Sequence, residues 1–431
     1  MTTANAGSHD HDLEGPEVDP GVAGNAALVA LIRRAIERRG RITFAEFMRI
    51  ALYDPDHGYY QSPARRPGRG GDFLTAPELH PFFGLSIARQ VAECWDCLGN
   101  PARFTVREFG AGIGGLAYDI IVGLLDRRPE IRSALRYQLV EVNPHRAAQA
   151  MAAMREVGFG GIVSVVDPTL DAPQPAAPIT GVVIANEVAD ALPVHRLQWN
   201  GAGFEELWVT WDAGRFAEIS GELSEPVSDP GIETPLTPLA YLARQGIDPA
   251  RWPVGARIEV SHAAATWIGG LARGIARGYA IVIDYGYPAP MLYRDHRLEG
   301  TVRGYYEHTV TDDPLIRAGR QDLTAHVDFT RLIEAASAAG MTLAGLTTQG
   351  DFLARIGLGD LLVELQRQPE LDAAEYYRAQ AAVFRLIDPA GLGRFRFLAL
   401  QKDVPDPAPL TGFAQPDVES DMLEMAELMD D

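Results

Sequence analysis

An acid followed by closely spaced glycines is the feature of this chain best suited to chemistry. Glu108 is followed by Gly110, Gly112 and Gly114, and then by another glycine. Apolar residues before the acid predict a strand, and the apolar run after the glycines predicts a helix. Glycines in such a turn let the backbone bend sharply and approach a nucleotide closely, where a Cβ atom would block it. The pattern indicates a nucleotide-binding turn, with a purely structural turn as the alternative.

Two nucleotide-binding templates fit these glycines. Gly110, Gly112 and Gly115 match the G-x-G-x-x-G of dinucleotide binders. Glu108 together with Gly110, Gly112 and Gly114 matches the E-x-G-x-G-x-G of S-adenosyl-L-methionine (SAM) methyltransferases. The acid favours the second template, because a pyrophosphate has no use for a carboxylate there, whereas the amino-acid moiety of SAM carries an ammonium. We therefore expect Glu108 and the three glycines to bind SAM.

Two further acids end predicted strands and are candidates for the adenosine. Glu141 ends the second predicted strand, where a carboxylate accepts both ribose hydroxyls. Asp167 ends the third and is a candidate for the adenine amino group. A surface carboxylate is the alternative for Glu141, and an Asp-Pro turn is the alternative for Asp167.

Three polar residues follow the fourth predicted strand. Asn186, Glu187 and Asp190 would lie where the methyl acceptor meets the sulfonium. Methyl transfer is an in-line displacement, so the protein mainly positions the reactants and handles the acceptor's proton. If the acceptor is an arginine, carboxylates three residues apart would clamp its guanidinium. We predict that these residues are catalytic; an acidic helix N-cap is the alternative.

The elements that position these residues alternate between strand and helix from residue 104 onward. Such alternation predicts a largely parallel sheet with helices on both faces. The expected fold is α/β, a Rossmann-like seven-stranded sheet of the class I SAM methyltransferase type with an added helical and insertion lobe. The predicted strands are 103–108, 137–141, 162–166, 181–185, 279–284, 341–347 and 394–401.

Composition shifts suggest the domain boundaries. We expect acidic, disordered tails at 1–25 and 403–431, a helical N-terminal region at 26–100 that is part of a substrate lobe, and a SAM-binding domain at 101–402. Three insertions interrupt that domain: a β-rich one at 195–257, a loop-like one at 287–325 and a helical one at 351–390.

The charge and cysteine content limit the classes of function. The formal net charge is −20, but the two acidic ends account for most of it, which leaves −6 for residues 21–402. A nucleic-acid partner is not expected. The longest apolar runs are too short for a membrane span. Two cysteines, as C-x-x-C without a second pair, give no metal site and fit a reducing cytoplasm, where we expect the protein.

Six ordered motifs make the chain resemble the MidA-like family of SAM-dependent methyltransferases. They begin at Asp54, Gly71, Glu108, Asn186, Asp284 and Asp322. One departure lies at Val188-Ala189, where an aromatic pair is usual. The resemblance implies SAM as cofactor. It also implies a protein arginine as acceptor, since the family includes the mitochondrial assembly factor that methylates a subunit of respiratory complex I.

Three classes of function follow from the residues and the resemblance. The first is a protein arginine methyltransferase acting on a subunit of respiratory complex I. The second is a small-molecule methyltransferase, suggested by the smaller residues at 188–189. The third is an assembly factor that binds SAM without turnover.

Overall fold

A computed structural model of the chain describes residues 23–62, 75–166, 177–224, 237–294, 297–405 and 407–413. Asp167, expected at the adenine, lies outside these ranges, as do most of the two acidic ends. Among the helices in these ranges, none combines the length and the apolar character needed to cross a membrane.

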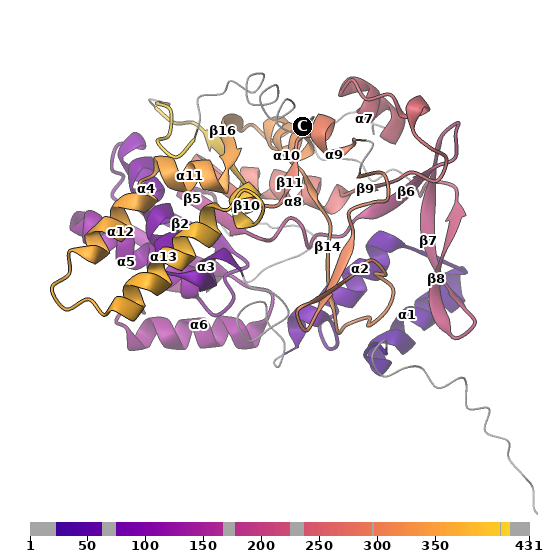
Figure 1. Cartoon of the computed structure of the whole chain (residues 1–431), viewed down its shortest axis with the longest axis horizontal. Coiled ribbons are helices and arrows are strands. Elements are labelled where there is room, and N and C mark those ends of the chain that lie inside the picture. The colour runs from indigo at the N-terminus through magenta and orange to yellow at the C-terminus, as the bar shows by residue number, and fades with distance from the viewer. Residues whose placement is uncertain are drawn as a thin grey trace, which may run out of the picture.

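A seven-stranded mixed sheet, here called the central sheet, lies among helices in the left half of Figure 1. Its strand order is β16-β17-β10-β5-β2-β3-β4. β10, β5, β2, β3 and β4 are parallel, whereas β17 is antiparallel to both β10 and β16. The bounds are β2 Phe104–Phe109, β3 Leu135–Val140, β4 Val163–Val166, β5 Ile179–Asn186, β10 Ile275–Asp284, β16 Thr342–Thr348 and β17 Arg396–Lys402. Each predicted strand overlaps one of these, and the α/β class is confirmed.

Helices cover both faces of this sheet, because successive side chains of its buried strands point to opposite faces. In β5, Val182 and Ile184 belong to one apolar cluster, and Val183 and Ala185 to another. The first cluster includes residues of α4 (Phe82–Cys97), α5 (Gly115–Arg127), α6 (Pro144–Glu156), α11 (Gln349–Arg355), α12 (Leu358–Gln366) and α13 (Ala373–Ile387). The second includes α8 (His262–Arg273) and α10 (Phe329–Ala338).

A second sheet lies beside the first, on the right of Figure 1. Its order is β1-β7-β6-β9, with β8 paired to β7. The bounds are β1 Ile42–Thr43, β6 His195–Trp199, β7 Phe204–Asp212, β8 Arg215–Gly221 and β9 Arg257–Val260. β1 pairs Ile42 with Val209, so the N-terminal region joins the insertion 167 positions later through this sheet. The helices α1 (Ala26–Arg39) and α2 (Phe44–Tyr53) pack against it.

The N-terminal region divides between the two sheets. α1 and α2 contact the second sheet, whereas α4 packs on α5 against the first, as do the helices of 351–390. The remaining bounds are η1 Tyr59–Gln61, α3 Ala76–Leu79, η2 Pro129–Ser133, α7 Pro238–Arg244, η3 Pro249–Arg251 and η5 Leu392–Arg394. The domain boundaries themselves stay a prediction.

The sequence predicted a loop-like insertion at 287–325, and this prediction is wrong. Its strands β12 (Arg303–Tyr306), β13 (Thr309–Thr311) and β14 (Asp322–Thr324) form a small antiparallel sheet in the order β13-β12-β14. α9 (Ala289–Leu292) precedes it, and β11 (Gly286–Tyr287) pairs with β15 (Val327–Asp328). These strands are too short to show an alternating pattern in the sequence.

Part of the segment expected to be a disordered tail, residues 407–413, packs against the main core. Leu410 and Phe413 are buried in the main core, and the ring of Phe413 lies 5.3 Å from that of Phe352. The Gly412 N–H also donates to Gln90 at 3.0 Å. Isolated apolar residues in a Pro-rich, acidic stretch carry no periodic signal, so the sequence did not reveal this packing.

Replacing Phe413 with Ala should therefore lower the free energy of unfolding by roughly 3–5 kcal/mol, as for other buried Phe side chains. Phe384 on α13 is a matched control, because its side chain is 63% exposed and Phe413 is 4% exposed. Urea titrations of both variants measure the difference. Equal midpoints for Phe413→Ala and Phe384→Ala would contradict the packing.

Candidate active site

The predicted site residues that the structure describes converge at one edge of the central sheet. β2, β3, β5 and β10 are parallel neighbours, so their carboxyl ends meet at the same edge. In open α/β sheets this edge is where ligands bind.

The glycine turn follows β2 in the way its sequence predicts. Gly110, Gly112 and Gly114 have φ values of +69°, +55° and +87°, a region that residues with a Cβ seldom occupy. Gly114 is the residue before α5. A Cβ on Gly112 would point into open space, with no atom within 4 Å. The turn therefore leaves a cradle beside its backbone that fits a closely approaching ligand.

Glu141 lies directly beside this turn. One of its carboxylate oxygens accepts the Gly112 N–H at 2.7 Å, and the other accepts the Asn143 N–H at 2.8 Å. A carboxylate offers about four lone-pair positions, so two remain for further donors such as ribose hydroxyls.

Glu108 is buried in β2, and the hydroxyl of Tyr137 donates to it at 2.6 Å. Burial raises the pKa of Glu108 to about 8, and the charge of Glu141 adds to this shift. An incoming ammonium would favour the ionised carboxylate.

Asn186, the last residue of β5, and the next residues, which include Glu187 and Asp190, form a tight acidic turn. Glu187 has φ +53°, rare for a side chain of this size, and its N–H donates to Ile283 O at 2.9 Å. The Asn186 amide donates to the Glu187 carboxylate at 3.1 Å. Burial, followed by the charge of Asp190, raises the pKa of Glu187 to about 8. Burial likewise raises the pKa of Asp190 to about 6.

Two buried acceptor atoms in this turn have no hydrogen-bond partner among the described residues. They are Asn186 Oδ1 and Asp190 Oδ1. The nearby Tyr285 hydroxyl lowers the pKa of Asp190 in part, but it does not complete a hydrogen bond of ordinary geometry. Buried acceptors without donors are costly, and a ligand that donates would satisfy these two atoms.

Asp284, at the end of β10, stabilises this turn by accepting hydrogen bonds from its backbone. It was not among the predicted site residues. Its Oδ2 accepts the N–H groups of Val188, Ala189 and Asp190 at 3.2, 2.9 and 3.2 Å. Burial raises the pKa of Asp284, with Asp190 and Glu187 adding to the shift. Its place at a strand end in a D-Y-G motif was the available signal.

The departure at Val188-Ala189 lies against the glycine turn. Val188 Cγ2 is 2.9 Å from the position that a Cβ on Gly110 would occupy, and Ala189 is buried. Gly110 is thus required both by its φ and by this close approach.

Tyrosines from α2 and η1 lie beside the acidic turn. The Tyr53 hydroxyl donates to Ala191 O at 3.0 Å, and the Tyr60 hydroxyl donates to both oxygens of the buried Asp322, at 2.9 and 3.1 Å. Tyr59, by contrast, is fully buried in the apolar cluster that α1 and α2 form with the second sheet. The sequence alone did not distinguish these roles.

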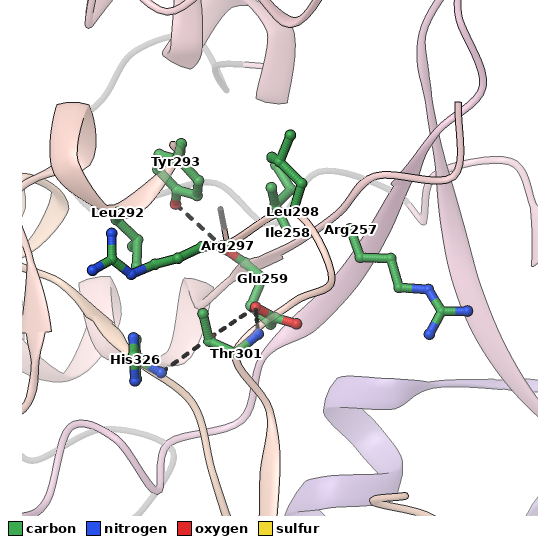
Figure 2. Close-up of a pocket in the computed structure, with 9 residues that line it drawn as sticks. All are labelled: Arg257, Ile258, Glu259, Leu292, Tyr293, Arg297, Leu298, Thr301 and His326. Carbon is green, nitrogen blue, oxygen red and sulfur yellow. Dashed lines mark hydrogen bonds between the residues drawn. The ribbon is translucent and has the colours of Figure 1, made fainter. Parts of the chain in front are cut away.

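A small cavity lies next to the site, around His326 (Figure 2). Its volume is about 10 Å³, room for about one water molecule. Thr301 links its walls, donating to Glu259 at 2.8 Å and accepting the His326 N–H at 3.1 Å. Burial, with nearby arginines, lowers the pKa of His326 to about 4. The cavity is too small for a cofactor or a methyl acceptor.

Asp328, six residues after Asp322, has a structural role. It accepts the Arg331 N–H at the start of α10 at 3.1 Å, and the hydroxyls of Tyr241 and Tyr293 at 2.6 and 3.0 Å. Within the ranges that the structure describes, no group of three or more His, Cys, Asp or Glu side chains is arranged to hold a metal ion.

Comparison with known proteins identifies the family. Residues 86–347 match the model of a family described as "Putative S-adenosyl-L-methionine-dependent methyltransferase". A crystal structure of a COG1565 superfamily member from Burkholderia thailandensis, bound to S-adenosyl-homocysteine, is 33% identical. It superposes with a TM-score of 0.78, covering 90% of this chain and 95% of that one.

Curated relatives are also similar to this chain over most of its length. The protein arginine methyltransferase NDUFAF7 of Mus musculus is 30% identical over 388 residues, or 85% of this chain and 82% of its own. The Drosophila melanogaster homologue is 29% identical over 421 residues, or 91% of this chain and 90% of its own. The chain belongs to this family of SAM-dependent methyltransferases. It is an enzyme of that class with SAM as its cofactor, as predicted.

The prediction of a cytoplasmic location is contradicted. The relatives from Drosophila melanogaster, Mus musculus and Homo sapiens are all named as mitochondrial proteins. Cysteine content and terminal charge describe the chemistry of a chain, and they do not by themselves specify a compartment.

Proposed function

We propose that this enzyme methylates an arginine side chain of a protein, with Asn186, Glu187 and Asp190 binding the acceptor. One observation carries the proposal: the buried turn presents unpartnered acceptor oxygens and carboxyl groups. Among the described residues, the groups that most strongly shift the pKa values of Glu187, Asp190 and Asp284 include no Lys or Arg. A guanidinium supplies both the positive charge and five donors, and it offers no acceptor.

The chemistry that follows is an in-line displacement. SAM supplies a methyl group on a positively charged sulfur. Glu187 and Asp190 would hold the guanidinium plane and favour the lone pair on one nitrogen. As the new N–C bond forms and the S–C bond breaks, that nitrogen must lose a proton, which a nearby carboxylate accepts. Asn186 Oδ1 would orient a second nitrogen by accepting its hydrogen.

The cofactor side of the site is proposed on the same basis. Glu108 would neutralise the ammonium, Gly110, Gly112 and Gly114 would admit the ligand to the backbone, and Glu141 would accept the ribose hydroxyls. The open space at Gly112 and the spare lone pairs of Glu141 support this assignment. If the seven strands of the central sheet are counted 1 to 7 in chain order, from β2 to β17, their order across the sheet is 3-2-1-4-5-7-6. This order supports a Rossmann-like, class I arrangement.

The substrate is proposed to be a protein because curated relatives are named protein arginine methyltransferases. A subunit of respiratory complex I is the first candidate, as the family resemblance implies. To test the acceptor class, the enzyme is incubated with methyl-labelled SAM and a peptide library. Its peptides are identical except at one position, which is Arg, Lys or Gln. Label on arginine peptides alone is expected. Label on lysine or glutamine peptides, or on none, would contradict the proposal.

Acceptor use should increase with pH. The pKa values of Asp190 (about 6) and Glu187 (about 8) are raised, so both are partly protonated near neutral pH, whereas a guanidinium stays charged. Only the ionised carboxylates attract it, so kcat/KM for the peptide should rise between about pH 6 and 9. In Glu187→Gln the rise near pH 8 should disappear.

Saturating SAM is needed in that measurement, because burial also raises the pKa of Glu108 to about 8 and SAM binding is expected to vary with pH. Calorimetric SAM titrations over the same range separate the two effects. A profile for the peptide that is flat or falls with pH would show that the carboxylates do not bind a cation.

A further inference from the structure

Tyr60 contacts both halves of the site through different atoms. Its hydroxyl donates to Asp322 on β14, at 2.9 and 3.1 Å. Its carbonyl oxygen accepts the side-chain amide of Asn143 at 2.9 Å. Asn143 lies two residues after Glu141 in the loop that follows β3, and it is fully buried. The neighbouring Gln61 also donates to the carbonyl of Val142 in this loop, at 3.0 Å.

These contacts complete a continuous hydrogen-bonded path across the site. It begins at the Gly112 N–H, which donates to Glu141, and continues through the Asn143 N–H, which donates to the other oxygen of Glu141. The Asn143 amide then reaches Tyr60, and Tyr60 reaches Asp322. Asp322 in turn accepts the N–H of Leu323 at 2.9 Å. Five residues from four separate segments thus connect the glycine turn to β14.

The acidic turn that contains Glu187 and Asp190, the proposed binding site of the methyl acceptor, lies beside this path. The ring of Tyr60 is 5.4 Å from that of Tyr53, whose hydroxyl donates to the carbonyl of Ala191, the residue after Asp190. The Asp190 carbonyl accepts the Ala325 N–H at 2.9 Å, one residue after β14 ends. Burial raises the pKa of Tyr53, and the charges of Asp322, Asp190 and Glu141 add to it, which places its hydroxyl near all three acids.

We propose that Tyr60 is a positioning residue that fixes the acceptor side of the site, through Asp322 and β14, relative to the cofactor loop at Glu141 and Asn143. This inference rests on the proposed function for its kinetic consequence. In-line transfer needs the reacting atoms about 3 Å apart, and small misplacements reduce the rate strongly. When the bound cofactor stabilises the Glu141 loop, the hydrogen bonds of Tyr60 also stabilise the position of β14.

Two variants cut the path on either side of Tyr60. Tyr60→Phe removes the hydroxyl and keeps the ring. Asn143→Ser removes the amide that reaches Tyr60 but keeps an oxygen that can accept the N–H groups of His145 and Arg146 at the start of α6. Tyr241→Phe is the matched control, because it removes a hydroxyl that donates to the buried Asp328, outside this path.

Amide hydrogen exchange at 322–325, with and without S-adenosyl-homocysteine, tests the coupling and needs no methyl acceptor. The ligand should slow exchange of these amides in the natural protein and in Tyr241→Phe, but not in Tyr60→Phe or Asn143→Ser. Equal protection in all four proteins would overturn the inference, as would the absence of protection in the natural protein. Because the acceptor is not used, these results are independent of whether arginine is methylated.

Turnover with the arginine peptide provides the second measurement. We expect kcat to fall roughly 10-fold in Tyr60→Phe and in Asn143→Ser, with the SAM dissociation constant changed less than about 3-fold. The double variant should be little slower than either single one, because both cut the same connection. A kcat equal to that of Tyr241→Phe, or a loss of SAM affinity in proportion to rate, would contradict the positioning role.

Discussion

Asp190→Asn and Glu187→Gln should each slow methyl transfer by roughly 10²-fold, the scale of a lost positioning or proton-handling group. Both changes keep the shape of the side chain and remove its charge. The carboxyls lie in a buried turn after β5, with Asp190 Oδ1 lacking a partner among the described residues. Neither carboxyl accepts a hydrogen bond from the glycine turn or from the Glu141 loop, so SAM affinity should change much less than the rate.

Single-turnover rates and calorimetric SAM titrations separate these two effects. Asp328→Asn is the control for removing a buried carboxylate, since Asp328 caps α10 and binds two tyrosines instead. It should reduce stability without a comparable loss of rate per folded molecule. If rate and SAM affinity fall in proportion in Asp190→Asn and Glu187→Gln, then the two residues belong to the cofactor site and the acceptor assignment is wrong.

Gly112→Val should abolish SAM binding while the fold survives. The φ of +55° disfavours any side chain, at a cost of roughly 1–2 kcal/mol. The larger effect comes from the position of the new side chain. It would fill the open space beside the turn and would stand where the ligand approaches the backbone. The variant should also weaken the contact between the Gly112 N–H and Glu141.

Gly99→Val is the control for backbone strain alone. Gly99 has φ +76° and open space around its Cβ position, but it lies after α4, away from the glycine turn. Both variants should lose a similar amount of thermal stability, and only Gly112→Val should lose SAM binding by calorimetry. Unchanged SAM affinity in Gly112→Val would show that the cofactor does not approach this turn.

Local sequence determined the parts of the molecule that depend on local chemistry. Glycine adopts positive φ far more readily than other residues, so the spacing of the glycines at 110, 112 and 114 indicated a turn of this kind. Apolar runs ending in Glu141 and Asn186 indicated buried strands with polar ends, and the parallel order of a covered sheet then predicted that these ends meet. The family resemblance and the SAM cofactor followed from motifs of the same local kind.

The contacts between distant segments were decided only by the tertiary structure. The hydrogen bond from Tyr60 to Asp322 joins residues 262 positions apart. Nothing in the spacing of the two motifs that contain them indicates that these residues are partners. The same holds for Asp284, which is one more strand-end acid in the sequence but in the fold accepts three successive N–H groups of the acidic turn after β5. Phe413 reads as part of a polar tail and is core in the fold because Phe352 lies beside it. A sequence pattern reports which face of an element is apolar, whereas the partner of that face, and the pKa of a carboxyl buried there, depend on which other segments pack against it.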